Sequence, residues 1–123
     1  MRALVLDDSR AMRMILTRIL REVGFEVAEA ADGREGLAQL ERGPVPDLAL
    51  IDWNMPEMDG LSFVKEVRQH DRYAGMMLMM VTTESEQSQI VRALAAGAHE
   101  YVIKPFTSEA IVDKLSLLGL ASV

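Results

Sequence analysis

The feature that most constrains this chain is a fivefold alternation of short apolar runs with segments of helical periodicity. Each run has the length of a buried strand, and each following segment repeats its apolar residues at the spacing of an amphipathic helix. Strands that alternate with helices form a parallel sheet covered on both faces, and right-handed crossovers make it doubly wound. The sequence therefore predicts an α/β fold with strands at residues 3–6, 26–30, 47–51, 76–81 and 100–103.

Capping signals and apolar spacing define the predicted helices between these strands. Ser9 is a favourable N-cap for the first helix, and Gly24 is a typical stop for it. The second helix is predicted at residues 33–41. Apolar residues mark the others: Leu61, Val64 and Val67; Ile90, Val91 and Leu94, ending at Gly97; and Ile111, Leu115 and Leu118. Residues 1–123 are thus expected to form one domain of ordinary size.

Charge and composition exclude several classes of protein. The formal net charge of −6 argues against a nucleic-acid partner, because such partners need a basic surface. The chain has no cysteine, which excludes a disulfide framework and a thiolate metal site. It also has neither the apolar run of a signal peptide nor the ~18 apolar residues of a membrane span. We therefore expect a cytoplasmic protein with no membrane contact.

Polar residues directly follow four of the predicted strands. In an open parallel sheet, ligands bind outside the carboxyl ends of the strands. The residues at these ends are Asp7 and Asp8 after the first strand, Asp52 after the third, Thr82 and Glu84 after the fourth, and Lys104 after the fifth. Carboxylates, a hydroxyl and an ammonium group are therefore expected to meet at one rim of the sheet.

Carboxylates this close together repel one another. At ~5 Å and an effective dielectric of ~20, one pair costs roughly 3 kcal/mol. Magnesium relieves such repulsion, and it prefers few carboxylates, several waters and a phosphate oxygen. A metal, a cation and a hydroxyl donor around an aspartate are the equipment for phosphoryl transfer, in which the aspartate carries the group as an acyl phosphate.

Each of these residues also has a simpler interpretation. Asp8 or Ser9 could cap the first helix, and Glu84 could be an acid favoured by the dipole at the start of the fourth helix. Trp53 is expected to cover the rim rather than to stack on a base. The combination of matching residues at four strand ends, rather than any single acid, favours a site.

Other phosphate and metal sites do not fit the spacing. Segment 52–57 begins like a calcium loop, but Pro56 stands where a ligand is needed and Glu57 where glycine is needed. The chain has no glycine-rich nucleotide-binding loop. A magnesium-dependent phosphatase with an aspartate nucleophile is an alternative, although such enzymes place a second acid where this chain has Asn54. A scaffold of the same fold that is never phosphorylated is a third possibility, but it predicts missing acids or a missing lysine, and neither is missing here.

The motifs of the chain resemble those of two-component response regulator receivers. The matching residues are Asp7-Asp8-Ser9, Asp52-Trp53-Asn54-Met55-Pro56 with Asp59-Gly60, Thr82, and Lys104-Pro105-Phe106. The resemblance is closest to the single-domain chemotaxis regulators of the CheY type, because of Met12-Arg13, Asn54 and Glu84. It implies a flavodoxin-like fold of five parallel strands in the order 2-1-3-4-5 with five helices.

The resemblance also implies a role for each matching residue. Asp52 is implied to accept a phosphoryl group from a histidine kinase. Asp7, Asp8, Asp52 and the main-chain carbonyl of Asn54 are implied to bind Mg²⁺. Thr82 and Lys104 are implied to contact the phosphoryl oxygens, and Tyr101 is implied to act with Thr82 as an aromatic switch. Asn54 and Glu84 are implied to tune dephosphorylation. The Lys104-Pro105 peptide bond is implied to be cis.

The implied output is binding rather than turnover. The family suggests a monomeric switch that is not an enzyme beyond assisting its own phosphorylation and dephosphorylation. Its expected partners are the kinase, a phosphatase, and a downstream protein such as a flagellar motor switch protein, bound by the face of helix four, strand five and helix five. Residues 85–89 contain no lysine, where some chemotaxis regulators have lysines on this surface.

Overall fold

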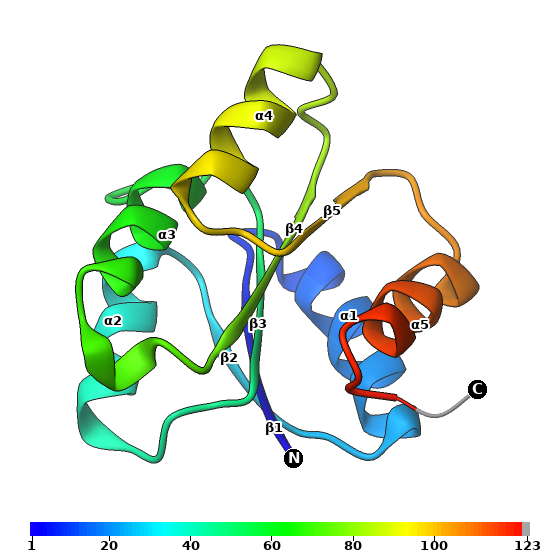
Figure 1. Ribbon diagram of the computed structural model, residues 1–123. Helices are drawn as coiled ribbons and strands as arrows, with labels where there is room; N and C mark the ends of the chain where they lie inside the picture. The colour runs from blue at the N-terminus through cyan, green and yellow to red at the C-terminus, as the bar shows by residue number, and fades with distance from the viewer. Residues whose placement is uncertain (122–123) are drawn as a thin grey trace.

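A five-stranded parallel sheet lies between two layers of helices in the computed structural model, which describes residues 1–121 (Figure 1). The strands lie in the order β2-β1-β3-β4-β5, which confirms the predicted topology. All five begin and end within one residue of the predicted positions. They are β1 (Arg2–Leu6), β2 (Glu26–Ala30), β3 (Leu48–Ile51), β4 (Met77–Thr82) and β5 (Glu100–Ile103).

The five predicted helices are also present, together with a short 3-10 turn, η1 (Asp71–Tyr73). Helices α1 and α5 pack together on one face of the sheet, and α2, α3 and α4 lie on the other (Figure 1). Their bounds are α1 (Arg10–Val23), α2 (Gly33–Arg42), α3 (Gly60–Arg68), α4 (Gln87–Ala96) and α5 (Ser108–Leu117). No helix among the described residues is long and apolar enough to cross a membrane.

Side-chain caps fix where several helices begin. Ser9 accepts a hydrogen bond from the Met12 N–H at 3.2 Å, so Ser9, rather than Asp8, caps α1. Asp59 caps α3 in the same way through the Ser62 N–H. Gly24 ends α1 with φ 114, a left-handed conformation that glycine adopts without steric cost, as the sequence predicted.

Two hydrophobic clusters make up the core, one on each face of the sheet. Alternation along β4 divides its methionines, so that Met79 faces the α1 and α5 side and Met80 faces the α3 side. Both are fully buried, as are all four residues of β3. Central strands buried on both faces form a rigid base for the residues at their ends.

Two of the three apolar residues that mark α4 in the sequence, Val91 and Leu94, do not face the core. Val91 and Leu94 are 56% and 43% exposed, whereas Ala93 is the buried residue of this helix. Helix α4 packs against α3 and β5, and its fully buried residue is the small Ala93, while Ile90 is half-buried. In α5, Ile111 and Leu115 are buried as expected, but Leu118 lies one residue beyond the helix as its C-cap.

Candidate functional site

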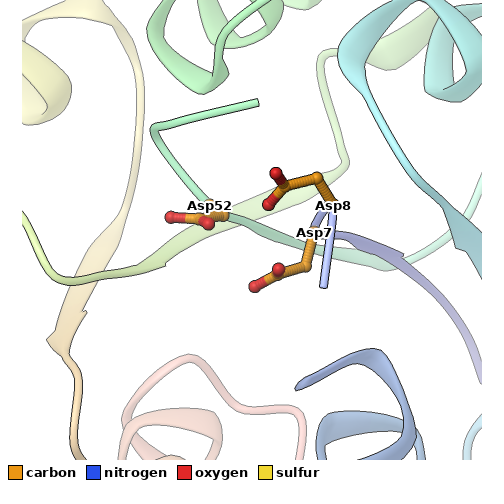
Figure 2. A group of neighbouring side chains, drawn as sticks. All are labelled: Asp7, Asp8 and Asp52. Carbon is orange, nitrogen blue, oxygen red and sulfur yellow. The ribbon is translucent and has the colours of Figure 1, made fainter. Parts of the chain in front are cut away.

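The carboxyl ends of β1 and β3 bring three acids together. Leu6 pairs with Ile51 in the parallel register, so the next residues, Asp7 and Asp52, lie side by side. One carboxylate oxygen from each of Asp7, Asp8 and Asp52 lies within 4.8 Å of the others (Figure 2). Oxygen donors at this spacing fit a hard divalent cation.

Backbone hydrogen bonds continue beyond the strand ends and hold the two buried acids in place. The Asp7 N–H donates to the Ala30 carbonyl at 3.1 Å, and the Asp52 N–H donates to the Leu6 carbonyl at 2.9 Å. Asp7 is 1% exposed and Asp52 is 8% exposed, whereas Asp8 is on the surface. The site therefore has a fixed, buried pair of carboxylates and one accessible carboxylate at its mouth.

Lys104 neutralises part of the charge in the site. Its Nζ lies 2.7 Å from Asp7 Oδ2 and 3.4 Å from Asp52 Oδ2. Lys104 directly follows β5, and its backbone N–H donates to the carbonyl of Thr82 at the end of β4 at 2.8 Å. The Lys104-Pro105 peptide bond is cis. One ammonium group opposes three carboxylates, so the cluster keeps a net negative charge that attracts a cation.

Asp52 is the member of the cluster with a perturbed acidity. Burial raises its pKa above the usual value for aspartate, because an ionised carboxylate loses solvation in the protein interior. The Thr82 hydroxyl and the Lys104 ammonium group lower the pKa in part, and the neighbouring Asp7 raises it further. Such a combination of desolvation and specific partners is typical of functional carboxylates.

Glu84 connects three of the predicted site residues. Its carboxylate accepts a hydrogen bond from Asn54 Nδ2 at 2.6 Å, and its carbonyl accepts one from the Tyr101 hydroxyl at 2.6 Å. Its own N–H donates to the Thr82 hydroxyl oxygen at 3.4 Å. Glu84 therefore does not act as a helix-start acid, because α4 begins three residues later with Glu86 as its N-cap.

The position of Trp53 differs from the prediction of a rim cover. The side chain is only 8% exposed and belongs to the core cluster on the α3 side of the sheet. The guanidinium carbon of Arg92, on α4, lies 5.9 Å from the centre of its ring. This contact of Arg92 is not predictable from the sequence, because an arginine on a helix surface carries no local signal of its tertiary contact.

Arg13 is a second residue whose contact with the site the sequence did not reveal. Its guanidinium donates to the Asp7 carbonyl at 2.7 Å and to Glu29 at 3.1 Å. It therefore supports the backbone of a site carboxylate from α1. His70 and His99 lie on the surface, and Nδ1 of His99 accepts a hydrogen bond from the Leu78 N–H.

Comparison with known proteins identifies the family. The family model described as "Response regulator receiver domain" matches residues 3–116. The chain belongs to this receiver family. As a receiver, it is 40% identical over 119 residues to chemotaxis protein CheY1 of Helicobacter pylori, with 96% of each chain covered.

Further relatives agree with this assignment. The receiver is 41% identical over 124 residues to a chemotaxis protein CheY homolog of Campylobacter jejuni, which covers 99% of this chain and 95% of the relative. Among solved structures, chemotaxis response regulator CheY4 of Vibrio cholerae superposes with a TM-score of 0.87 at 36% identity, covering 95% of this chain and 97% of the other. The predicted CheY-like fold is therefore confirmed, and the receiver is a two-component signalling domain.

Proposed function

We propose that this receiver is a phosphorylation-controlled binding switch, with Asp52 as the phosphoacceptor. The observation that carries the proposal is the position of Asp52 at the end of β3. There its carboxylate lies within 4.8 Å of oxygens from Asp7 and Asp8 and within 3.4 Å of the Lys104 ammonium group. A nucleophile, a cation-binding pair of acids and a fixed positive charge are the parts that phosphoryl transfer requires.

Mg²⁺ is the cation that fits this set of oxygen donors. The residues proposed to hold it are Asp7, Asp8, Asp52 and the main-chain carbonyl of Asn54. When bound, the ion would neutralise the charge that develops on the phosphoryl oxygens. Since Lys104 already neutralises one of the three acids, two negative charges remain for the divalent ion to balance.

The proposed reaction transfers a phosphoryl group from a histidine of the kinase to Asp52. A carboxylate oxygen of Asp52 forms a bond to phosphorus, while the bond from phosphorus to the imidazole nitrogen breaks and its electron pair stays on that nitrogen. Thr82 and Lys104 would contact the phosphoryl oxygens of the resulting acyl phosphate. Lys104 can do so because its flexible side chain already lies against Asp52.

The lifetime of the acyl phosphate is proposed to depend on Asn54 and Glu84. Their side chains meet at 2.6 Å and join the loops that follow β3 and β4, next to Asp52. Water that hydrolyses the acyl phosphate has to approach along this side. The pair is therefore placed to tune dephosphorylation, whether intrinsic or assisted by a phosphatase.

The output is proposed to pass through Thr82 and Tyr101 to the face formed by α4, β5 and α5. Movement of Thr82 toward the phosphoryl oxygens would disturb its bond to the Glu84 N–H, and Glu84 also holds the Tyr101 hydroxyl. Val91, Leu94 and Ile103 expose apolar surface on α4 and β5, which suits a protein partner. In chemotaxis such a partner would be a flagellar motor switch protein.

Energetic estimates indicate that the partner contributes to the switch. Shifting a two-state population from 1:99 to 99:1 takes about 5.5 kcal/mol. New hydrogen bonds from Lys104 and Thr82 supply roughly 2–4 kcal/mol together. The shift is therefore incomplete in the isolated domain, and a partner that binds the active state stabilises it in return. We propose that the switch acts as a cytoplasmic monomer.

The decisive functional experiment separates a switch from an enzyme. With a small-molecule phosphodonor and Mg²⁺, we expect at most one phosphoryl group per chain and no sustained turnover of phosphate esters. Affinity of a partner peptide should rise with beryllofluoride, a phosphoryl mimic, and rise less in Thr82→Ala. Sustained ester hydrolysis would favour the phosphatase alternative. If beryllofluoride raises the partner affinity of Thr82→Ala as much as that of wild type, the proposed coupling through Thr82 and Tyr101 is rejected.

A further inference from the structure

Gly60, the first residue of α3, lies directly against the backbone of Asp52. A Cβ atom built on Gly60 would overlap the Asp52 carbonyl oxygen, and it would lie 2.9 Å from the Asp52 carbonyl carbon and 3.0 Å from Ile51 Cγ2. The φ angle of Gly60 is outside the left-handed range, so the backbone conformation itself does not require glycine. Space, rather than conformation, excludes a side chain here.

The other glycines of the chain differ in what surrounds them. At Gly36 and Gly97, the atoms nearest to an added Cβ belong to the side chains of Leu6 and Arg68 rather than to the main chain. At Gly75, nothing lies within 4 Å. Gly60 is the glycine whose neighbour is the main chain of the proposed phosphoacceptor.

Hydrogen bonds and packing hold both the Asp52 backbone and the start of α3 in place. On one side, the Asp52 N–H is bonded to the Leu6 carbonyl at 2.9 Å. On the other, the Gly60 N–H donates to the Trp53 carbonyl at 2.8 Å, and the Asp59 cap fixes the first turn of α3. The helix is also anchored by the fully buried side chains Phe63, Val64 and Val67.

We propose that Gly60 is a positioning residue for Asp52. The missing side chain at the start of α3 sets where the Asp52 carboxylate lies relative to Asp7 and Asp8. An ordinary contact between carbon atoms is ~3.5 Å, so a methyl group at Gly60 forces a displacement of roughly 0.5 Å or more. Reactive groups have to be held within about 0.5 Å, and a misplacement of ~1 Å can reduce a rate about a hundredfold. The inference rests on the phosphorylation proposed for Asp52.

The test is Gly60→Ala. Its Mg²⁺ affinity is measured by calorimetry, and its rate of phosphorylation is measured with a small-molecule phosphodonor. We expect both to fall at least tenfold. Gly75→Ala is the matched control and should change neither. Leu115→Ala, a core truncation on the opposite face of the sheet, controls for lost stability, since it should lower the free energy of unfolding without affecting Mg²⁺ affinity.

A stabilised parent protein keeps Gly60→Ala folded, so that its Mg²⁺ affinity and phosphorylation rate can be measured. Glu57 has φ 65, which is unfavourable for a non-glycine residue, and its side chain is exposed. Glu57→Gly should therefore stabilise the fold, and all variants can be compared in that background. Unchanged Mg²⁺ affinity and rate in Gly60→Ala, or an equal loss in Leu115→Ala, would overturn the positioning role.

The two readouts separate this inference from the proposed function. If Mg²⁺ affinity falls in Gly60→Ala while the background protein itself is never phosphorylated, the positioning of the acids is supported and the phosphoacceptor function is rejected. If the background protein is phosphorylated on Asp52 and Gly60→Ala retains full rate and Mg²⁺ affinity, the function stands and the positioning role is rejected.

Discussion

Neutralising Asp8 should stabilise the metal-free protein and weaken its response to Mg²⁺. Asp8 is the exposed member of the cluster, and its carboxylate oxygen lies within 4.8 Å of oxygens of Asp7 and Asp52. A unit charge pair at that distance repels by about 3.5 kcal/mol at an effective dielectric of ~20, and by about 0.9 kcal/mol in water. Exposure of Asp8 and the ion pair between Lys104 and Asp7 both favour the lower figure. Asp8→Asn should therefore raise the free energy of unfolding in EDTA by about 1 kcal/mol.

Mg²⁺ should remove the higher stability of Asp8→Asn relative to wild type. At a concentration of 100 Kd, the ion stabilises the wild type by about 2.7 kcal/mol, and a tenfold weaker variant gains only about half of that. The assay is urea denaturation with and without Mg²⁺, and Asp113→Asn on α5 is a control that removes an exposed charge outside the cluster. If Asp8→Asn is no more stable than wild type in EDTA, or gains as much from Mg²⁺, the acids do not form one electrostatic cluster.

Three further predictions concern the chemistry of the site. Replacing Asn54 or Glu84 by a bulky or basic residue should change the dephosphorylation rate severalfold or more, as measured by the decay of the acyl phosphate; equal lifetimes across the series would exclude both side chains from the water path. Lys104→Ala should still accept phosphate on Asp52, yet show a smaller rise in partner affinity; a full response would mean that Lys104 does not sense the phosphoryl group. A carboxyl group with a raised pKa in the folded state destabilises the fold as pH rises through that pKa. Asp52→Asn should therefore be more stable than wild type at pH 7 in EDTA, and the difference in stability should vanish in acid. A difference that does not change with pH would mean that the pKa of Asp52 is not raised.

Periodicity and capping were sufficient to predict the order and extent of the elements. Buried strands such as β3 are short and uniformly apolar, and residues such as Ser9 and Gly24 mark helix ends through local hydrogen bonding and backbone conformation. These signals depend on neighbours in sequence, which is why they can be read without a structure.

The exposure of α4 and the burial of Trp53 depend instead on tertiary packing. Val91 and Leu94 have the spacing of a core-facing stripe, but α4 uses Ala93 for its contact with the rest of the molecule. Trp53 follows the site in sequence, yet its ring enters the core and contacts Arg92 from a different helix. Nothing local distinguishes these outcomes, because they depend on where helices lie relative to the sheet.

The grouping of the site acids was predictable for a topological reason. Parallel strands place all their carboxyl ends at one edge, so Asp7 and Asp52 had to be near each other once β1 and β3 were neighbours. The contact of Gly60 with the Asp52 carbonyl was not predictable, because it depends on the approach of α3 to the end of β3 to within a fraction of an ångström.

The most direct test of the central claim is to locate the phosphoryl group. The protein would be incubated with a small-molecule phosphodonor and Mg²⁺, the acyl phosphate reduced with borohydride, and the modified residue identified by peptide mass spectrometry. We predict a single modified residue, Asp52, and no modification in Asp52→Asn. Phosphate on Ser9 or Thr82, or undiminished labelling of Asp52→Asn, would contradict the assignment of Asp52 as the phosphoacceptor.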